Sequence, residues 1–213
     1  MTSHNIKLII FDFDGVLRDA SWRYLYDAYK VLIETAGKDP DSFFTDVDSF
    51  RKWTNMDWHK NEERIFGGAY VPNPEFDKKF HAAYDPNIKL FPWVSDTLAQ
   101  LSQKYALAML SSSSKASIEK ELGELSRYFS FVLGAEDVVR LKPDPEGVQK
   151  IVKLTGAKES ETLMIGDMSV DFLAGSGAGA KTGLVKWGLG DWEDLLALKP
   201  DFLFEEPGEL LRL

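Results

Sequence analysis

Six short, largely apolar segments recur along the chain, and helical patterns separate most of them. Each segment is too short for a buried helix, which favours strands that are buried on both faces. The segments are Lys7 to Phe11, Ala106 to Leu110, Phe131 to Gly134, Thr162 to Ile165, Thr182 to Val185 and Phe202 to Phe204. Strands that alternate with helices require crossover connections, so we predict an α/β fold with a parallel sheet covered by helices on both faces.

The clearest helix start between these segments is Asp144-Pro145-Glu146. It offers an N-cap, a first-turn proline and a first-turn acid, and apolar residues follow at helical spacing. We therefore predict a helix that begins with Asp144 as its N-cap.

About 70 residues between the first two segments contain helical patterns but no convincing strand. We predict an inserted helical domain at residues 18–89, with residues 1–17 and 90–213 forming the core domain. Residues 19–90 hold 14 of the 27 Trp, Tyr and Phe side chains. A small domain needs large side chains to close its core, so packing explains this enrichment better than ligand contact does, although contact stays open.

Composition excludes several classes of function. The chain has 25 basic and 34 acidic residues, a net charge of −9 that argues against nucleic acid or a membrane surface as partners. It has no cysteine, which excludes thiolate metal sites and cysteine nucleophiles. Its N-terminus lacks a signal-peptide pattern and no apolar stretch is long enough for a membrane span, so we expect a cytoplasmic protein.

Acidic residues follow two of the predicted strands. Asp12 and Asp14 come directly after the first strand, and Asp167 and Asp171 follow the strand that begins at Thr162. Strands of a parallel sheet point the same way, so these ends can converge at one edge and offer oxygen ligands to a hard cation such as Mg²⁺. A plain turn is the alternative for the first pair, because Asp and Gly favour turns.

A calcium loop that starts at Asp12 does not fit the sequence. Its glycine position would be Leu17 and its bidentate glutamate position would be Arg23.

Two further strand ends carry groups that suit a phosphoryl site. Ser111 and Ser112 open a run of four serines, and Lys142 lies in Lys-Pro-Asp-Pro. Hydroxyls and amides can hold phosphate oxygens, and lysine supplies a positive charge. Taken alone, a serine run is also typical of a helix start, and a lysine before proline is typical of a solvated turn.

In this order, Asp-Phe-Asp-Gly at residues 12–15, Ser111, Lys142 and Gly166-Asp167 with Asp171 resemble the four motifs of the haloacid dehalogenase superfamily. The resemblance spans nearly the whole chain. The insert is similar in place and size to the α-helical cap of the phosphoglycolate-phosphatase-like branch. The resemblance therefore implies a Rossmann-like three-layer α/β core with an inserted α-helical cap domain.

The resemblance also implies roles for individual residues. Asp12 would be the nucleophile that forms an aspartyl-phosphate, and Asp14 the acid that protonates the leaving oxygen and later activates water. Ser111, Ser112 and Lys142 would bind the phosphoryl group. The expected Mg²⁺ ligands are Asp12, Asp14 through its backbone carbonyl, and Asp167, with Asp171 in a supporting position.

Three positions depart from the commoner pattern of the family. Val16 replaces a frequent threonine, Ser112 a frequent asparagine, and Trp93 a frequent glycine. None of these changes removes a catalytic group, but at Ser112 we expect phosphate contacts that differ from those of the commoner asparagine. Asp14 itself argues for phosphate esters, because a halide leaves without a proton whereas an alkoxide needs one.

We expect a Mg²⁺-dependent phosphatase that acts on a small phosphorylated metabolite, as a monomer or homodimer. A phosphomutase of the same family and a non-catalytic metal-binding or regulatory module are the alternatives. The motifs do not identify the phosphate ester, nor whether pyrophosphate or a nucleotide is preferred.

Overall fold

The computed structural model describes residues 5–54, 58–68, 78–79, 82–83 and 88–213. The chain divides into two compact units, one of Met1–Asp19 with Lys89–Leu213 and one of Ala20–Ile88. Within the described part of the chain, every helix is too short or too polar to cross a membrane.

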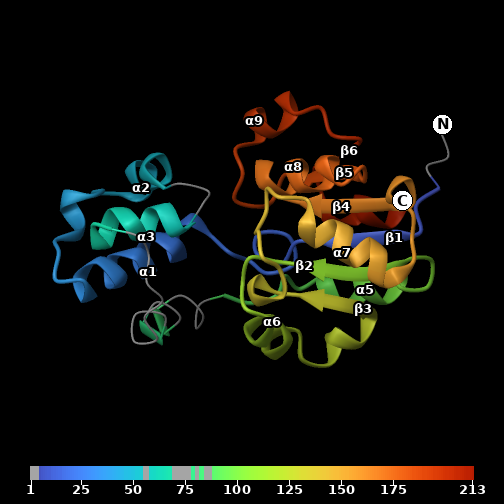
Figure 1. Ribbon diagram of the computed structural model, residues 1–213, viewed down its shortest axis with the longest axis horizontal. Helices are drawn as coiled ribbons and strands as arrows, with labels where there is room; N and C mark the ends of the chain where they lie inside the picture. The colour runs from blue at the N-terminus through green and yellow to red at the C-terminus, as the bar shows by residue number, and fades with distance from the viewer. Residues whose placement is uncertain (1–4, 55–57, 69–77, 80–81, 84–87) are drawn as a thin grey trace. The chain divides into compact units, whose positions relative to one another are not determined.

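The first unit is built on a six-stranded sheet with the order β3-β2-β1-β4-β5-β6 (Figure 1). Every neighbouring pair is parallel, as predicted. The strands are β1 (Leu8–Phe11), β2 (Ala106–Leu110), β3 (Phe129–Leu133), β4 (Thr162–Gly166), β5 (Lys181–Val185) and β6 (Phe202–Phe204). The main difference from the predicted segments is β3, which begins at Phe129 because this residue also pairs with Leu107 across an irregular register.

Helices cover both faces of the sheet (Figure 1). The described helices of this unit are α5 (Val94–Leu101), α6 (Lys115–Leu122), α7 (Glu146–Thr155), α8 (Ser169–Gly177) and α9 (Trp192–Ala197). Side chains alternate along β1, so Ile9 and Phe11 join the core that includes α5 and α6, whereas Leu8 and Ile10 join the core under α7 and α8. All four are fully buried, which explains why this strand is apolar throughout.

The predicted start of α7 is displaced by one residue. The helix begins at Glu146, and Pro145 rather than Asp144 is its N-cap. Asp144 still accepts a hydrogen bond from the Glu146 N–H at 2.9 Å, so its side chain satisfies a donor of the first turn. The physical role predicted for this aspartate is retained although the boundary differs.

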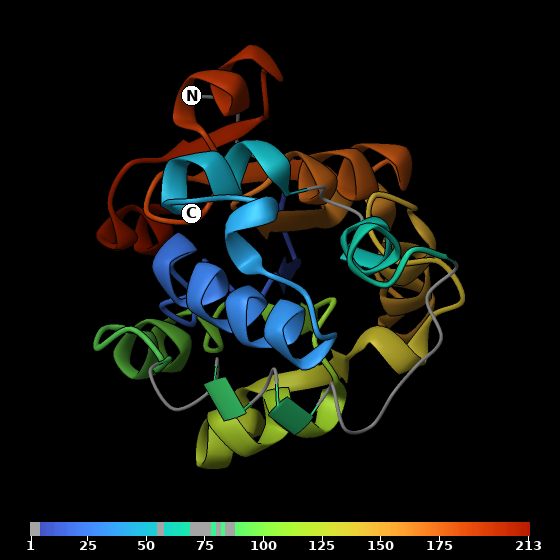
Figure 2. The same ribbon diagram turned by 90° about the vertical axis from the view of Figure 1, so that its left-hand side faces the viewer.

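The second unit contains α1 (Trp22–Thr35), α2 (Val47–Trp53) and α3 (Trp58–Phe66), and α1 lies beside α2 (Figure 2). Its core is aromatic, and Phe50 is central to it. The Phe50 ring centroid lies 4.8 Å from that of Phe44, 5.3 Å from that of Tyr29 and 6.0 Å from that of Tyr26. Packing therefore accounts for these aromatic side chains.

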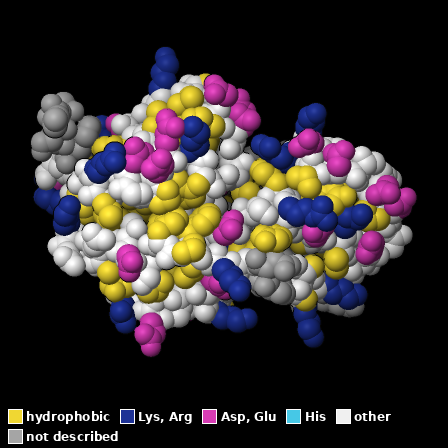
Figure 3. Space-filling view, turned by 180° about the vertical axis from the view of Figure 1, so that it is seen from behind, with side chains coloured by type: hydrophobic (Ala, Val, Ile, Leu, Met, Phe, Trp, Pro, Cys, Tyr) yellow, Lys and Arg dark blue, Asp and Glu magenta, His cyan; other side chains and the backbone are white. Residues whose placement is uncertain are grey.

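Charged side chains of both signs are interspersed on the face shown in Figure 3. The net charge of −9 is therefore not gathered into one acidic area on this face. An anion that binds to this protein would have to be attracted by cations placed locally.

Candidate active site

The register of the sheet brings the predicted motifs to one edge. Phe11 at the end of β1 pairs with Met109 of β2 and with Ile165 of β4. Asp12, Ser111 and Asp167 follow these three partners by one or two residues, so they emerge together at the carboxyl ends of the strands. This edge is where parallel α/β sheets bind ligands.

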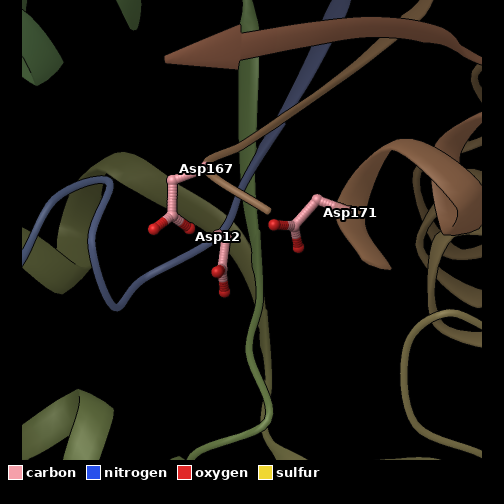
Figure 4. Close-up of side chains that lie close together, drawn as sticks. All are labelled: Asp12, Asp167 and Asp171. Atoms are coloured by element: carbon pink, nitrogen blue, oxygen red, sulfur yellow. The ribbon is translucent and has the colours of Figure 1, made fainter. Parts of the chain in front are cut away.

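Three carboxylates converge at this edge (Figure 4). Asp12 follows β1, Asp167 follows β4 and Asp171 lies in α8. Each offers an oxygen within 4.8 Å of the others, and all three residues are buried. Carboxylates this close repel one another unless cations or protons compensate for their charge.

Lys142 supplies one buried positive charge. Its Nζ lies 2.8 Å from Asp12 Oδ1 and 2.5 Å from Asp171 Oδ1, and only 4% of its side chain is exposed. Burial alone would lower the pKa of Lys142, but the attraction of Asp12 and Asp171 outweighs burial and raises it. Lys142 is therefore cationic at neutral pH.

One lysine does not balance three carboxylates. Burial raises the pKa of Asp12 to about 7, although Lys142 opposes this change. Burial, followed by repulsion from Asp171 and Asp12, also raises the pKa of Asp167 well above its usual value. The negative charge of the three carboxylates is therefore not fully balanced, and an additional cation would stabilise their ionised forms.

The surroundings of Asp167 fit a metal ion. Its Oδ2 accepts a hydrogen bond from the Leu189 N–H at 2.6 Å, but its buried Oδ1 has no hydrogen-bond partner among the described residues. Gly15 has a φ of +80°, and a Cβ at this glycine would collide with the Asp167 carboxylate. A buried oxygen without a donor, held beside two further carboxylates, matches the oxygen ligands that Mg²⁺ requires.

Asp171 uses both of its oxygens within the protein. Oδ1 accepts a hydrogen bond from Lys142 Nζ, and Oδ2 accepts one from the Met168 N–H at 3.0 Å. This geometry suits a supporting position better than a direct one. Its part in metal binding stays a prediction.

The predicted phosphate-binding residues lie together. Ser111, Ser112 and Lys142 line one hollow, and Arg140 lines it as well. The Arg140 guanidinium pairs with Asp144 at 2.6 Å, which satisfies part of its charge. Ser111, Ser112 and Lys142 are thus neighbours, and hydroxyl and ammonium groups are the kinds of group that can bind a phosphoryl oxygen.

The Asp14 carboxylate is not one of the three clustered carboxylates, and residues that the sequence motifs did not indicate bind it. Arg18 and the Ser113 hydroxyl bind its two oxygens. The metal role predicted for Asp14 involves its backbone carbonyl and stays a prediction. The position of Arg18 four residues after Asp14 was visible, but such spacing indicates contact only within a helix, and these residues lie on either side of a turn. The Leu189 amide was also missed, because a backbone donor leaves no mark in the sequence.

A family model described as haloacid dehalogenase-like hydrolase matches residues 9–185 of the chain. The pyrophosphatase PpaX of Bacillus cereus strain Q1 is 34% identical over 97% of this chain and 95% of its own length. The protein of the same name from Bacillus cereus strain AH820 is also 34% identical, and the alignment covers 62% of each chain, just under two thirds of that relative.

Among solved structures, a predicted phosphoglycolate phosphatase from Haemophilus somnus 129pt superposes with a TM-score of 0.73. It is 21% identical to this chain, and the match covers 99% of this chain and 98% of that one. This likeness concerns the fold, which agrees with the predicted three-layer α/β core.

Proposed function

This chain belongs to the haloacid dehalogenase-like hydrolases, and we propose that it is a Mg²⁺-dependent phosphatase that forms an aspartyl-phosphate on Asp12. The observation that carries the proposal is a buried carboxylate, Asp12, placed between the Lys142 ammonium and the half-satisfied carboxylate of Asp167. This arrangement suits a nucleophile that must approach an anionic phosphoryl group.

In the first step, an oxygen of Asp12 attacks phosphorus and the bond between phosphorus and the leaving oxygen breaks. Asp14 gives its proton to that leaving oxygen. Lys142 neutralises charge between Asp12 and the phosphoryl group, and Ser111 with Ser112 holds phosphoryl oxygens. Asp12, the carbonyl of Asp14 and Asp167 would hold Mg²⁺, which when bound neutralises negative charge on the phosphoryl oxygens.

In the second step, water attacks phosphorus and the bond to Asp12 breaks. Asp14, now ionised, takes a proton from the water and returns to its starting state. The products are the protonated leaving group, which is an alcohol for an alkyl ester and phosphate for pyrophosphate, and inorganic phosphate, and the enzyme is regenerated. We further propose that residues 20–88 act as the helical cap that restricts water during these steps.

The substrate class is a small phosphorylated compound. The relatives named pyrophosphatase PpaX make inorganic pyrophosphate the first compound to test, beside phosphoglycolate and other metabolite monoesters. A phosphomutase would return the phosphoryl group to a sugar phosphate. Release of inorganic phosphate without a second substrate therefore separates a phosphatase from a mutase.

The mechanism is tested with Asp12→Asn, which keeps the shape of the side chain and an acceptor for Lys142. We expect turnover of p-nitrophenyl phosphate to need Mg²⁺, to stop with EDTA and to fall at least about 10³-fold in the variant. When the phosphoryl group of the substrate carries a radiolabel, label bound to the protein after an acid quench should appear only with the wild type.

Asp201→Asn, which changes an aspartate paired with Lys181, serves as the matched control and should keep full activity. Substantial turnover by Asp12→Asn would overturn the mechanism. A wild type that releases no phosphate from any compound of the panel would favour the non-catalytic module.

A further inference from the structure

Both oxygens of the Asp14 carboxylate are held by side chains outside the four motifs. Arg18 Nε lies 2.6 Å and Nη2 2.5 Å from Oδ1, and the Ser113 hydroxyl donates to Oδ2 at 2.7 Å. We propose that Arg18 and Ser113 are positioning residues, which orient Asp14 so that Oδ2 exchanges the proton with the leaving oxygen and then with water. The inference rests on the acid–base role proposed for Asp14 above.

Arg18 is a rigid support for this carboxylate. Its side chain is only 3% exposed, and its guanidinium carbon lies 4.8 Å from the ring centroid of the fully buried Phe13. Its backbone is bonded on both sides, since its N–H donates to the Phe13 carbonyl and its own carbonyl accepts from the Gly15 N–H. A guanidinium fixed in this way limits the rotation of Asp14.

The two oxygens of Asp14 have different surroundings. Oδ1 receives two guanidinium donors, and arginine has no acceptor, so a proton on Oδ1 would face N–H groups directly. The Ser113 hydroxyl at Oδ2 can either donate or accept. Oδ1 is thus occupied by the guanidinium whereas Oδ2 faces a hydroxyl, which makes Oδ2 the oxygen suited to proton transfer.

Ser113 also connects Asp14 to the phosphate-binding turn. Its N–H donates to Ser111 Oγ at 3.0 Å, while its hydroxyl binds Asp14. One turn after β2 thus sets both the hydroxyl that holds the phosphoryl group and the position of the acid. The Asp14 side chain is 22% exposed, so it keeps access to a bound substrate.

The test compares p-nitrophenyl phosphate with an alkyl phosphate in wild type, Arg18→Met, Arg18→Lys, Ser113→Ala and Ser113→Thr. The ratio kcat/KM covers the steps up to phosphoryl transfer to Asp12, in which Asp14 acts as an acid. The aryl oxide leaves without a proton, whereas the alkoxide needs one. A residue that orients the acid therefore affects the two substrates unequally.

In Arg18→Met and Ser113→Ala we expect kcat/KM for the alkyl phosphate to fall by about 10²-fold, and that for the aryl phosphate by less than about threefold. The kcat for the aryl phosphate should fall, because Asp14 also activates water in the second step. Since kcat/KM for this substrate stays nearly unchanged, its KM should fall in parallel with its kcat. Arg18→Lys and Ser113→Thr keep a donor and should recover part of the loss.

Arg18→Met removes a buried cation, so Ser113→Ala, at a half-buried residue, provides the same comparison with less risk to the fold. Arg127→Lys is the matched control, since this exposed arginine also pairs with an acid and stacks on a neighbouring ring. If the variants lost kcat/KM equally for both substrates while the wild type was active, the inference would be overturned and the phosphatase proposal would stand. No turnover by wild type would overturn both.

Discussion

Asp167→Asn offers a sharp test of the buried acidic cluster. Asparagine has the same shape and keeps an oxygen to accept the Leu189 N–H, but it carries no charge. We expect the metal-free variant to be more stable than the metal-free wild type near pH 8. We also expect Mg²⁺ to stabilise only the wild type.

The magnitude follows from the geometry of the cluster. Two unit charges 4.8 Å apart repel by about 3 kcal/mol at an effective dielectric constant of roughly 20. The folded wild type relieves part of this repulsion by binding protons, because burial raises the pKa of Asp12 to about 7 and that of Asp167 well above its usual value. We therefore expect a gain of about 1–3 kcal/mol in the free energy of unfolding.

The gain should depend on pH. As pH rises from the unfolded pKa of about 4 to the folded pKa of Asp12 of about 7, the folded wild type holds protons that its unfolded state has released. Wild-type stability contributed by this group is complete below that range and is lost as pH rises through it. Because the pKa of Asp167 is also raised, the advantage of Asp167→Asn should be smallest near pH 4 and should grow as pH rises.

Mg²⁺ adds the second half of the test. A ligand at 100 times its Kd stabilises a folded protein by about 2.7 kcal/mol. For a chain of this size, each kcal/mol raises Tm by roughly 2–4 °C. We therefore expect a rise of roughly 5–11 °C for the wild type and none for Asp167→Asn, measured by thermal unfolding in EDTA and in Mg²⁺.

Asp201→Asn is the control, and we expect it to lower the free energy of unfolding where Asp167→Asn raises it. Its carboxylate accepts from Lys181 Nζ at 2.7 Å and from the Thr182 N–H at 2.9 Å, so its loss should cost about 1–2 kcal/mol and leave the Mg²⁺ response intact. If metal-free Asp167→Asn were less stable than wild type near pH 8, the repulsion inferred for the cluster would be wrong. A Mg²⁺ shift that persists in Asp167→Asn would refute the metal site.

Two further substitutions test the same region by urea unfolding. Lys142→Met leaves two buried carboxylates without their cation, so it should lower the free energy of unfolding by about 3 kcal/mol near pH 8. The loss should be smaller near pH 5, where those acids can protonate. An equal loss at both pH values would contradict the charge balance. Gly188→Ala would place a Cβ against the Asp167 carboxylate and should cost about 1–3 kcal/mol while weakening the Mg²⁺ response. Gly208→Ala, whose Cβ would meet nothing within 4 Å, should change stability by less than about 0.5 kcal/mol, and a comparable loss there would remove the steric explanation.

Local patterns were sufficient to predict the sheet. The run from Leu8 to Phe11 is apolar throughout because both of its faces are covered, and this information lies within the segment itself. Boundaries were less predictable. The extension of β3 to Phe129 depends on a partner in β2, and the first residue of α7 depends on backbone angles at Pro145.

The sequence by itself determined the order of the elements, the places of Asp12, Ser111 and Asp167 directly after strands, and the place of Lys142 shortly before a helix, because periodicity and motif spacing are properties of the chain alone. Only the tertiary structure decided that Asp167 keeps one buried oxygen without a donor. It also decided that Arg18 and Ser113 hold Asp14 from two sides. The physical reason is that parallel pairing brings together residues far apart in the sequence, such as Asp14 and Ser113, whose numbers differ by 99, and this packing decides which side chains become partners.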